Sequence, residues 1–347
     1  MKGRQWVACW VAATAASGSF AALAATGPMP TGQAPSDNQA AFHTMLLGQA
    51  RKVAASGQPL DLLAAAWLAS PVELPASNDP PASPSHSDAW LDDAIRLGSD
   101  QPMIARAAVM RCLGGGSCDI PAAIQTLQTE ESDDVGAQLL LWRMHAGKGD
   151  TDAAAQAWAR ATQATRYADE VAEGVALLDH ATRGVHWPAW GEDADPGMRT
   201  DSETIRAVTV FALVAASWMP GLGDAHRQCP ADVSGEQRQR CRHLFKVMAD
   251  SNAFVTANVG VGKMRELSDD AAERQSWEGR KRELMWLAQR SAPLLSARRD
   301  DVPPLETNDY LQRVGEKGEL PAIRQLLADN GIATQPPADW EPAAPGN

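Results

Sequence analysis

Residues 134–167 read DVGAQLLLWRMHAGKGDTDAAAQAWARATQATRY, and this stretch decides the fold. Apolar and small residues recur at helical spacing over Val135–Ala146 and again over Asp152–Thr165. Between the two patterns, only residues 147–151 remain for the connection, and short connections favour antiparallel hairpins. The stretch therefore predicts two antiparallel helices joined by a tight turn.

Similar helical patterns fill most of the chain, whereas runs rich in Val, Ile, Tyr, Phe and Thr are almost absent. The patterns before and after the central pair cover Asp37–Ser56, Pro59–Ser70, Ala89–Leu97, Pro102–Cys112, Ile120–Glu130, Asp169–Thr182, Ile205–Trp218, Asn252–Glu266, Asp269–Ala292, Thr307–Gly315 and Pro321–Asp329. Short connections between consecutive helices favour antiparallel hairpins. We therefore expect an all-α fold, built either as an α-solenoid or as an irregular helical bundle.

The central stretch resembles one tetratricopeptide repeat of about 34 residues. The resemblance rests on Leu141, Gly149, Asp150, Ala154, Trp158 and Ala161. It departs from the family pattern at Trp142 and His145, and Pro is missing near Arg166. The resemblance implies a helical-repeat protein that binds a protein or peptide partner in a groove, with Gln138 and Arg143 exposed on the first helix.

The N-terminus has the features of a secretory signal peptide. Lys2 and Arg4 precede an apolar run, and the small-residue ending Ala22-Leu23-Ala24 follows. The run is diluted by Thr, Ser and Gly, which favours cleavage over a membrane anchor. We therefore expect the mature chain in the periplasm or secreted, where disulfides form readily.

Composition divides the chain into six parts. We expect a signal peptide at 1–25, a disordered lead at 26–36, a helical-hairpin, repeat-like region at 37–185, a linker at 186–199, a C-terminal helical region at 200–331, and a disordered tail at 332–347 in which Trp340 could dock. Whether the two helical regions form separate domains is left open by the sequence.

Charge and helix length narrow the classes of partner. The chain has 31 Lys and Arg against 43 Asp and Glu, so losing Lys2 and Arg4 leaves a net charge of about −14. Such a chain repels nucleic acid and anionic lipid headgroups. The most apolar helix of the mature chain, Ile205–Trp218, is too short to span a bilayer. We expect no nucleic-acid partner and no membrane span after cleavage.

Four cysteines remain in the mature chain, and their spacing suggests two local disulfides. Cys112 and Cys118 flank a flexible Gly-rich loop, while Cys229 lies in a loop shortly before Cys241 on an amphipathic helix. Zinc ligation is disfavoured because the chain has no CxxC motif. We predict the pairs Cys112–Cys118 and Cys229–Cys241, with free buried thiols as the alternative.

Two tryptophans flank a proline in the segment between the two helical regions. Trp187 and Trp190 could form a stacking platform for a peptide or sugar, because rigid aromatic rings bind at low entropic cost. The alternative is that they fill the contact between helical layers.

Catalytic motifs are absent from the sequence, which also predicts no cofactor and no metal site. The remaining enzyme hypothesis is a periplasmic hydrolase with a site near residues 180–195. It would use His180, His186 or His226 as base and an acid from the run at 192–195. The favoured hypothesis is a partner-binding helical protein.

The signal-peptide assignment predicts the mature N-terminus. Because a signal peptidase reads small residues such as Ala22 and Ala24, we expect the exported protein to begin at Ala25 or Thr26. Intact-mass measurement of the exported protein tests this. A retained Met1, or a mass increase from lipid on Cys9, would contradict it.

Overall fold

The structure is a computed structural model that describes residues 37–73, 85–188, 202–217, 222–295 and 307–342. The expected signal peptide, the lead at 26–36 and most of the expected linker lie outside these ranges. The described residues form fifteen α-helices, and their only β-type pairing is an isolated bridge between Asp134 and Arg166. The all-α prediction is confirmed.

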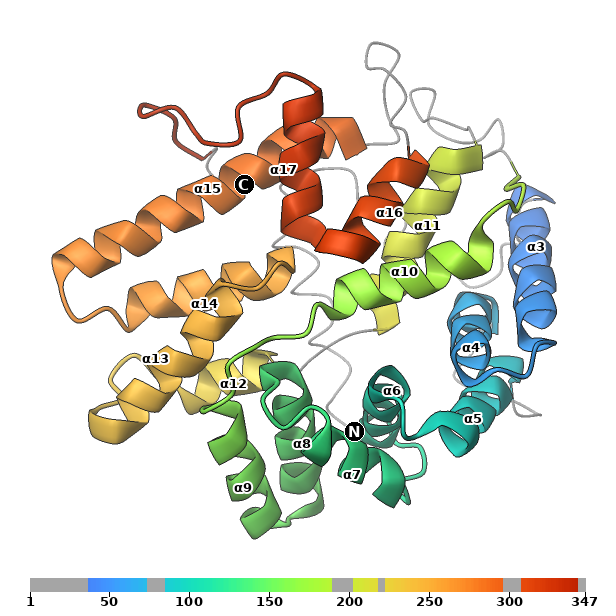
Figure 1. Cartoon of the computed structure of the whole chain (residues 1–347), viewed down its shortest axis with the longest axis horizontal. Helices are drawn as coiled ribbons and strands as arrows, with labels where there is room; N and C mark the ends of the chain where they lie inside the picture. The colour runs from blue at the N-terminus through green and yellow to red at the C-terminus, as the bar shows by residue number, and fades with distance from the viewer. Residues whose placement is uncertain (1–36, 74–84, 189–201, 218–221, 296–306, 343–347) are drawn as a thin grey trace.

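The helices follow one another with mostly short connections, as Figure 1 shows. Those before the expected linker are α3 (Asp37–Ala54), α4 (Pro59–Glu73), α5 (His86–Gly98), α6 (Pro102–Leu113), α7 (Pro121–Thr129), α8 (Val135–Lys148), α9 (Thr151–Ala161) and α10 (Glu170–Thr182). Those after it are α11 (Ser202–Ser217), α12 (Leu222–Gln228), α13 (Gly235–Ala249), α14 (Phe254–Glu266), α15 (Ala271–Leu295), α16 (Thr307–Lys317) and α17 (Glu319–Asp329). Consecutive helices such as α3 and α4, α8 and α9, and α13 and α14 pack against each other.

The predicted central hairpin is formed by α8 and α9. Gly149 ends α8 in the left-handed conformation, with φ of 75°, and the Asp150 side chain caps α9 by accepting a hydrogen bond from the Ala153 N–H at 3.1 Å. Ala154 and Ala161 are buried, as expected where two helices approach closely. Trp142 and Trp158 pack across the hairpin with ring centroids 5.2 Å apart. The hairpin is confirmed, and its membership of the tetratricopeptide family stays a prediction.

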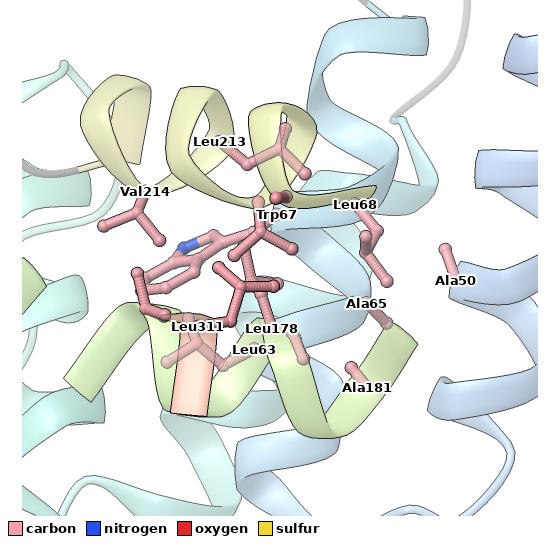
Figure 2. Packing of buried hydrophobic residues seen from close by; sticks show 14 of the residues in the cluster. Ala50, Leu63, Ala65, Trp67, Leu68, Leu178, Ala181, Leu213, Val214 and Leu311 are labelled. Atoms are coloured by element: carbon pink, nitrogen blue, oxygen red, sulfur yellow. The ribbon is translucent and has the colours of Figure 1, made fainter. Parts of the chain in front are cut away.

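Helix α10 lies at the centre of the fold (Figure 1). Its Leu178 and Ala181 join one hydrophobic cluster with Leu63 and Trp67 of α4, and with residues of α11 and α16 (Figure 2). The two helical regions expected from sequence therefore share a core. Contacts of α10 with α4 and with α16 join elements far apart in the chain, which is typical of an irregular helical bundle rather than of a solenoid with neighbour-only contacts.

A buried ionic network joins α6, α8 and α10. The Arg106 side chain of α6 is fully buried and its guanidinium donates hydrogen bonds to carboxylates of Glu131, before α8, and Glu173, on α10. Glu170 is buried in the same region and accepts a hydrogen bond from the Tyr167 hydroxyl at 3.3 Å. Burial raises the pKa of Glu170 from 4.5 to about 8, against the opposing attraction of Arg106.

Asp134 fixes the start of α8 within this network. Its fully buried carboxylate accepts hydrogen bonds from the N–H groups of Ala137, at 2.9 Å, and Ala168, at 2.5 Å. One carboxylate therefore caps α8 and holds the segment that leads into α10. Because a buried charge is costly unless it is paired and hydrogen-bonded, removing any partner in this network should destabilise the fold.

Both predicted disulfides are present. Cys112 at the end of α6 is bonded to Cys118, with Cα atoms 4.8 Å apart, and Cys229 is bonded to Cys241 of α13, with Cα atoms 5.8 Å apart. Two disulfides in one chain are typical of proteins that fold in an oxidising compartment.

Helices α13 and α14 approach each other closely at one glycine. A Cβ atom on Gly260 would lie 2.3 Å from the backbone nitrogen of Ala249 and 2.7 Å from the Phe245 carbonyl oxygen. Gly262, two residues later on α14, has nothing within 4 Å of its Cβ position. Only the first of the two glycines is required by packing.

The close approach predicts opposite effects for two alanine substitutions on α14. Gly260→Ala should destabilise the protein by ~1–3 kcal/mol, because the backbones must separate. Gly262→Ala should stabilise it by ~0.5–1 kcal/mol, because Ala is the better helix former. Urea unfolding of both variants measures this, and equal midpoints would refute the close-packing assignment.

The raised pKa of Glu170 predicts a pH effect on stability. Between about pH 4.5 and pH 8 the unfolded chain loses this proton while the folded protein keeps it, so the contribution of Glu170 to stability falls as pH rises. Glu170→Gln cannot titrate and should show a smaller loss of stability than the parent between pH 5 and pH 8. Urea unfolding at both pH values gives the comparison.

The exposed Glu130→Gln is the matched control and should keep the parental pH dependence. Comparing each variant with its parent cancels the contributions of the other titrating groups. If Glu170→Gln and the parent lose stability equally over this range, the assignment of the effect to Glu170 is wrong.

Candidate functional site

The predicted partner-binding residue Gln138 is buried, so the expectation that it is exposed is wrong. Its amide donates hydrogen bonds to the carbonyl oxygens of Leu127 and Glu131, both at 2.9 Å, and accepts one from Arg160 at 2.9 Å. The side chain satisfies backbone carbonyls at the end of α7 and in the following turn. It cannot also contact a partner.

Arg143, the second residue predicted to face a groove, is partly exposed. Its Nε lies 3.3 Å from Oδ2 of Asp224, which joins α8 to α12. An ion pair at the surface leaves Arg143 accessible to solvent, with 41% of its side chain exposed. Its role in partner binding stays a prediction.

Trp187 is buried, and the stacking-platform hypothesis is wrong for this residue. Its ring packs against Phe42 of α3 with centroids 5.8 Å apart, and its side chain belongs to the cluster around α10. Residue 187 is therefore part of the core rather than of a linker, because its indole is buried in this cluster beside α3. Trp190 lies outside the described residues.

The acid that the hydrolase hypothesis takes from 192–195 lies outside the described residues, so only the three histidines are placed. His180 and His186 are exposed. His226 Nε2 lies 3.4 Å from Nζ of Lys263, which is paired with Glu266 at 2.7 Å. Burial, and then the Lys263 charge, lower the pKa of His226. The hydrolase hypothesis stays a prediction.

The strongest candidate site is a face of α15 that holds the non-helical segment after α17. Residues 332–342, expected to be disordered, follow α17 and run beside α15 (Figure 1). Arg282 Nη2 donates hydrogen bonds to three of their carbonyl oxygens: Pro337 at 3.0 Å, Ala338 at 3.2 Å, and Trp340. The disorder prediction is therefore wrong for residues 332–342, and residues 343–347 lie outside the described ranges.

An aromatic contact fixes the same segment one turn further along α15. The rings of Trp286 and Trp340 meet edge to face with centroids 5.2 Å apart, a favoured aromatic geometry. The Trp286 indole N–H donates to the Ala333 carbonyl at 2.7 Å. The Arg290 guanidinium lies 4.2 Å from the centre of the Trp286 ring. We call Arg282, Trp286 and Arg290 the tail face.

Helix α17 holds the tail face in place. Glu283 accepts hydrogen bonds from Arg280 on its own helix at 2.6 Å and from Arg324 of α17 at 2.8 Å. Burial opposes ionisation of Glu283, but these hydrogen bonds outweigh it and lower the pKa of its carboxyl group. The carboxylate is therefore ionised at neutral pH and fixes the helix that presents Arg282 and Trp286.

Sequence reasoning identified Trp340 as a docking residue but missed the surface that receives it. Arg282, Trp286 and Arg290 are spaced by four residues, which places them on one face of a helix. That spacing was available as a signal. The identity of the covering segment was not, because only the tertiary fold returns the chain from α17 to α15.

Comparison with protein-family models, with curated proteins and with solved structures finds no match for this chain. Within the part of the chain that the structure describes, no three His, Cys, Asp or Glu side chains are grouped so that they could hold a metal ion. In the same described ranges, no single helix has the length and apolar composition needed to cross a membrane.

Proposed function

We propose that the chain is exported to the periplasm or secreted, and that it binds a short, turn-forming segment of a partner protein on the tail face of α15. The observation that carries the proposal is the set of three backbone carbonyls that Arg282 contacts in residues 337–340. These carbonyls converge on one guanidinium nitrogen because residues 337–340 form a turn, in which the Trp340 N–H donates to the Pro337 carbonyl at 3.1 Å. The contact therefore favours a peptide segment that forms the same turn.

The construction of the face supports the same proposal. The Trp286 side chain is only 4% exposed beneath the segment, and it offers both an aromatic surface and an N–H donor. Tryptophan and arginine are the residues that most often dominate binding energy at protein interfaces. The rigid support from α17 reduces the entropic cost of binding, because the two side chains are already positioned.

Export is supported by two independent features. The signal-peptide pattern at residues 1–25 and the two disulfides both fit an oxidising compartment outside the cytoplasm. The tetratricopeptide resemblance at residues 134–167 agrees with a partner-binding role, although we place the binding surface on α15 rather than on that hairpin.

The test uses a fluorescent peptide with the sequence of residues 333–342, ATQPPADWEP, and the full chain carrying Trp340→Ala, which weakens the chain's own hold on the face. Fluorescence anisotropy should show saturable binding. Adding Arg282→Gln should weaken it by at least tenfold, because hydrogen bonds from a charged donor are worth ~1.5–3 kcal/mol each. No saturable binding to the Trp340→Ala chain would refute the proposal.

Arg274→Gln in the same Trp340→Ala chain is the matched control. Arg274 is exposed on α15, two turns before Arg282, and lies outside the tail face. This substitution removes the same charge from the same helix and should leave binding unchanged. An equal loss of binding in the Arg274 and Arg282 variants would reveal a nonspecific charge effect and would also contradict the proposal.

A further inference from the structure

We propose that the partner segment is proline-rich and carries a tryptophan, and that the chain's own tail, residues 333–342, occupies the tail face as a tethered competitor. This inference rests on the proposed function, because it names the partner chemistry and the regulation of the same site.

Proline-rich sequence fits the contacts that Arg282 makes. Pro336 and Pro337 hold their backbone dihedral φ near the extended value and have no N–H to donate, so the segment presents its carbonyls outward at little entropic cost. Pro337 is also the first residue of a turn, in which the Trp340 N–H donates to the Pro337 carbonyl at 3.1 Å. That turn directs the Trp340 ring onto Trp286.

Charge favours the same class of partner. Asp339 and Glu341 flank Trp340 in the tail, while the face presents Arg282 and Arg290. A segment with acidic residues beside its tryptophan is therefore attracted to the face, and a basic segment of the same shape is disfavoured.

The tail can leave without opening the core. Ile332 packs against the cluster formed by α14, α15 and α17, whereas no residue from 333 to 342 belongs to a hydrophobic cluster of the described fold. Residues 333–342 are exposed or partly exposed. Because Ile332 stays packed in the core and its N–H stays bonded to the Leu327 carbonyl at 2.9 Å, only the residues after it need to leave the face.

A tethered segment competes strongly with a free one. A short flexible tether gives an effective concentration in the millimolar range, so an added peptide binds only to the fraction of molecules whose tail has left. The apparent affinity of the intact chain is lowered by that fraction. A partner protein displaces the tail from the tail face when it makes additional contacts with the chain outside that face.

The experiment compares the wild-type chain with Trp340→Ala, using the same labelled ATQPPADWEP peptide and anisotropy. We expect Trp340→Ala to bind about tenfold more tightly than wild type, because loss of the aromatic pair shifts the tail off the face. Gln335→Ala, at an exposed position of the same tail that leaves the Trp340 ring and both acidic residues intact, is the control and should bind like wild type. Circular dichroism and urea unfolding confirm that the variants keep the parental fold.

The partner chemistry is tested with variant peptides on the Trp340→Ala chain. Replacing the peptide's tryptophan by alanine should weaken binding about tenfold, and replacing both prolines by glycine should weaken it severalfold. A scrambled peptide that binds as well as the parent would overturn the assignment of a proline-rich, tryptophan-bearing partner.

The remaining outcomes separate the two proposals. Equal affinity of wild type and Trp340→Ala would overturn the tethered competitor and leave the proposed function standing. No binding to either chain would overturn both. A concentration-dependent wild-type dimer in light scattering, abolished by Trp340→Ala, would place the tail on a second copy and overturn competition within one chain.

Discussion

The burial of Arg106 is the constraint on which the arrangement of the helices depends. A guanidinium without access to water must keep its carboxylate partners, and these come from the segment before α8 and from α10. Asp134 extends the same network by capping α8 and binding the Ala168 N–H. The network therefore fixes α6, α8 and α10 relative to one another, where apolar packing alone would allow several arrangements.

Helix α10 connects this ionic network to the hydrophobic core. Its N-terminal end carries the carboxylates of the ionic network, and its Leu178 and Ala181 enter the cluster shared with α4, α11 and α16. At Glu319 the next helix, α17, begins, and its Arg324 bonds to Glu283 of α15. The helix that carries the tail face is therefore supported by a continuous set of packed helices, which keeps Arg282 and Trp286 in position for the segment that covers them.

Predictions from the sequence were correct where a residue contacts its near neighbours in the chain, and wrong where its surroundings are set by the tertiary fold. The α8–α9 hairpin was predictable because helical periodicity and a short connection act over neighbouring residues, and Gly149 and Asp150 then cap the two helices locally. Both disulfides close short loops, which is why spacing alone paired them correctly. Gln138 and Trp187 have polar or amphipathic side chains of the kind often found at surfaces. The sequence does not reveal that carbonyls at the end of α7 and in the following turn bind Gln138, or that Trp187 packs against Phe42.

The sequence by itself determined the helical class, the hairpin at residues 134–167 and the disulfide pairs, because periodicity, capping and short loop closure act over few residues. Only the tertiary structure decided that Arg106 is buried among carboxylates from separate helices. It alone decided that residues 332–342 return to cover Trp286. These contacts join residues tens of positions apart, and their energies depend on burial, which no local pattern specifies.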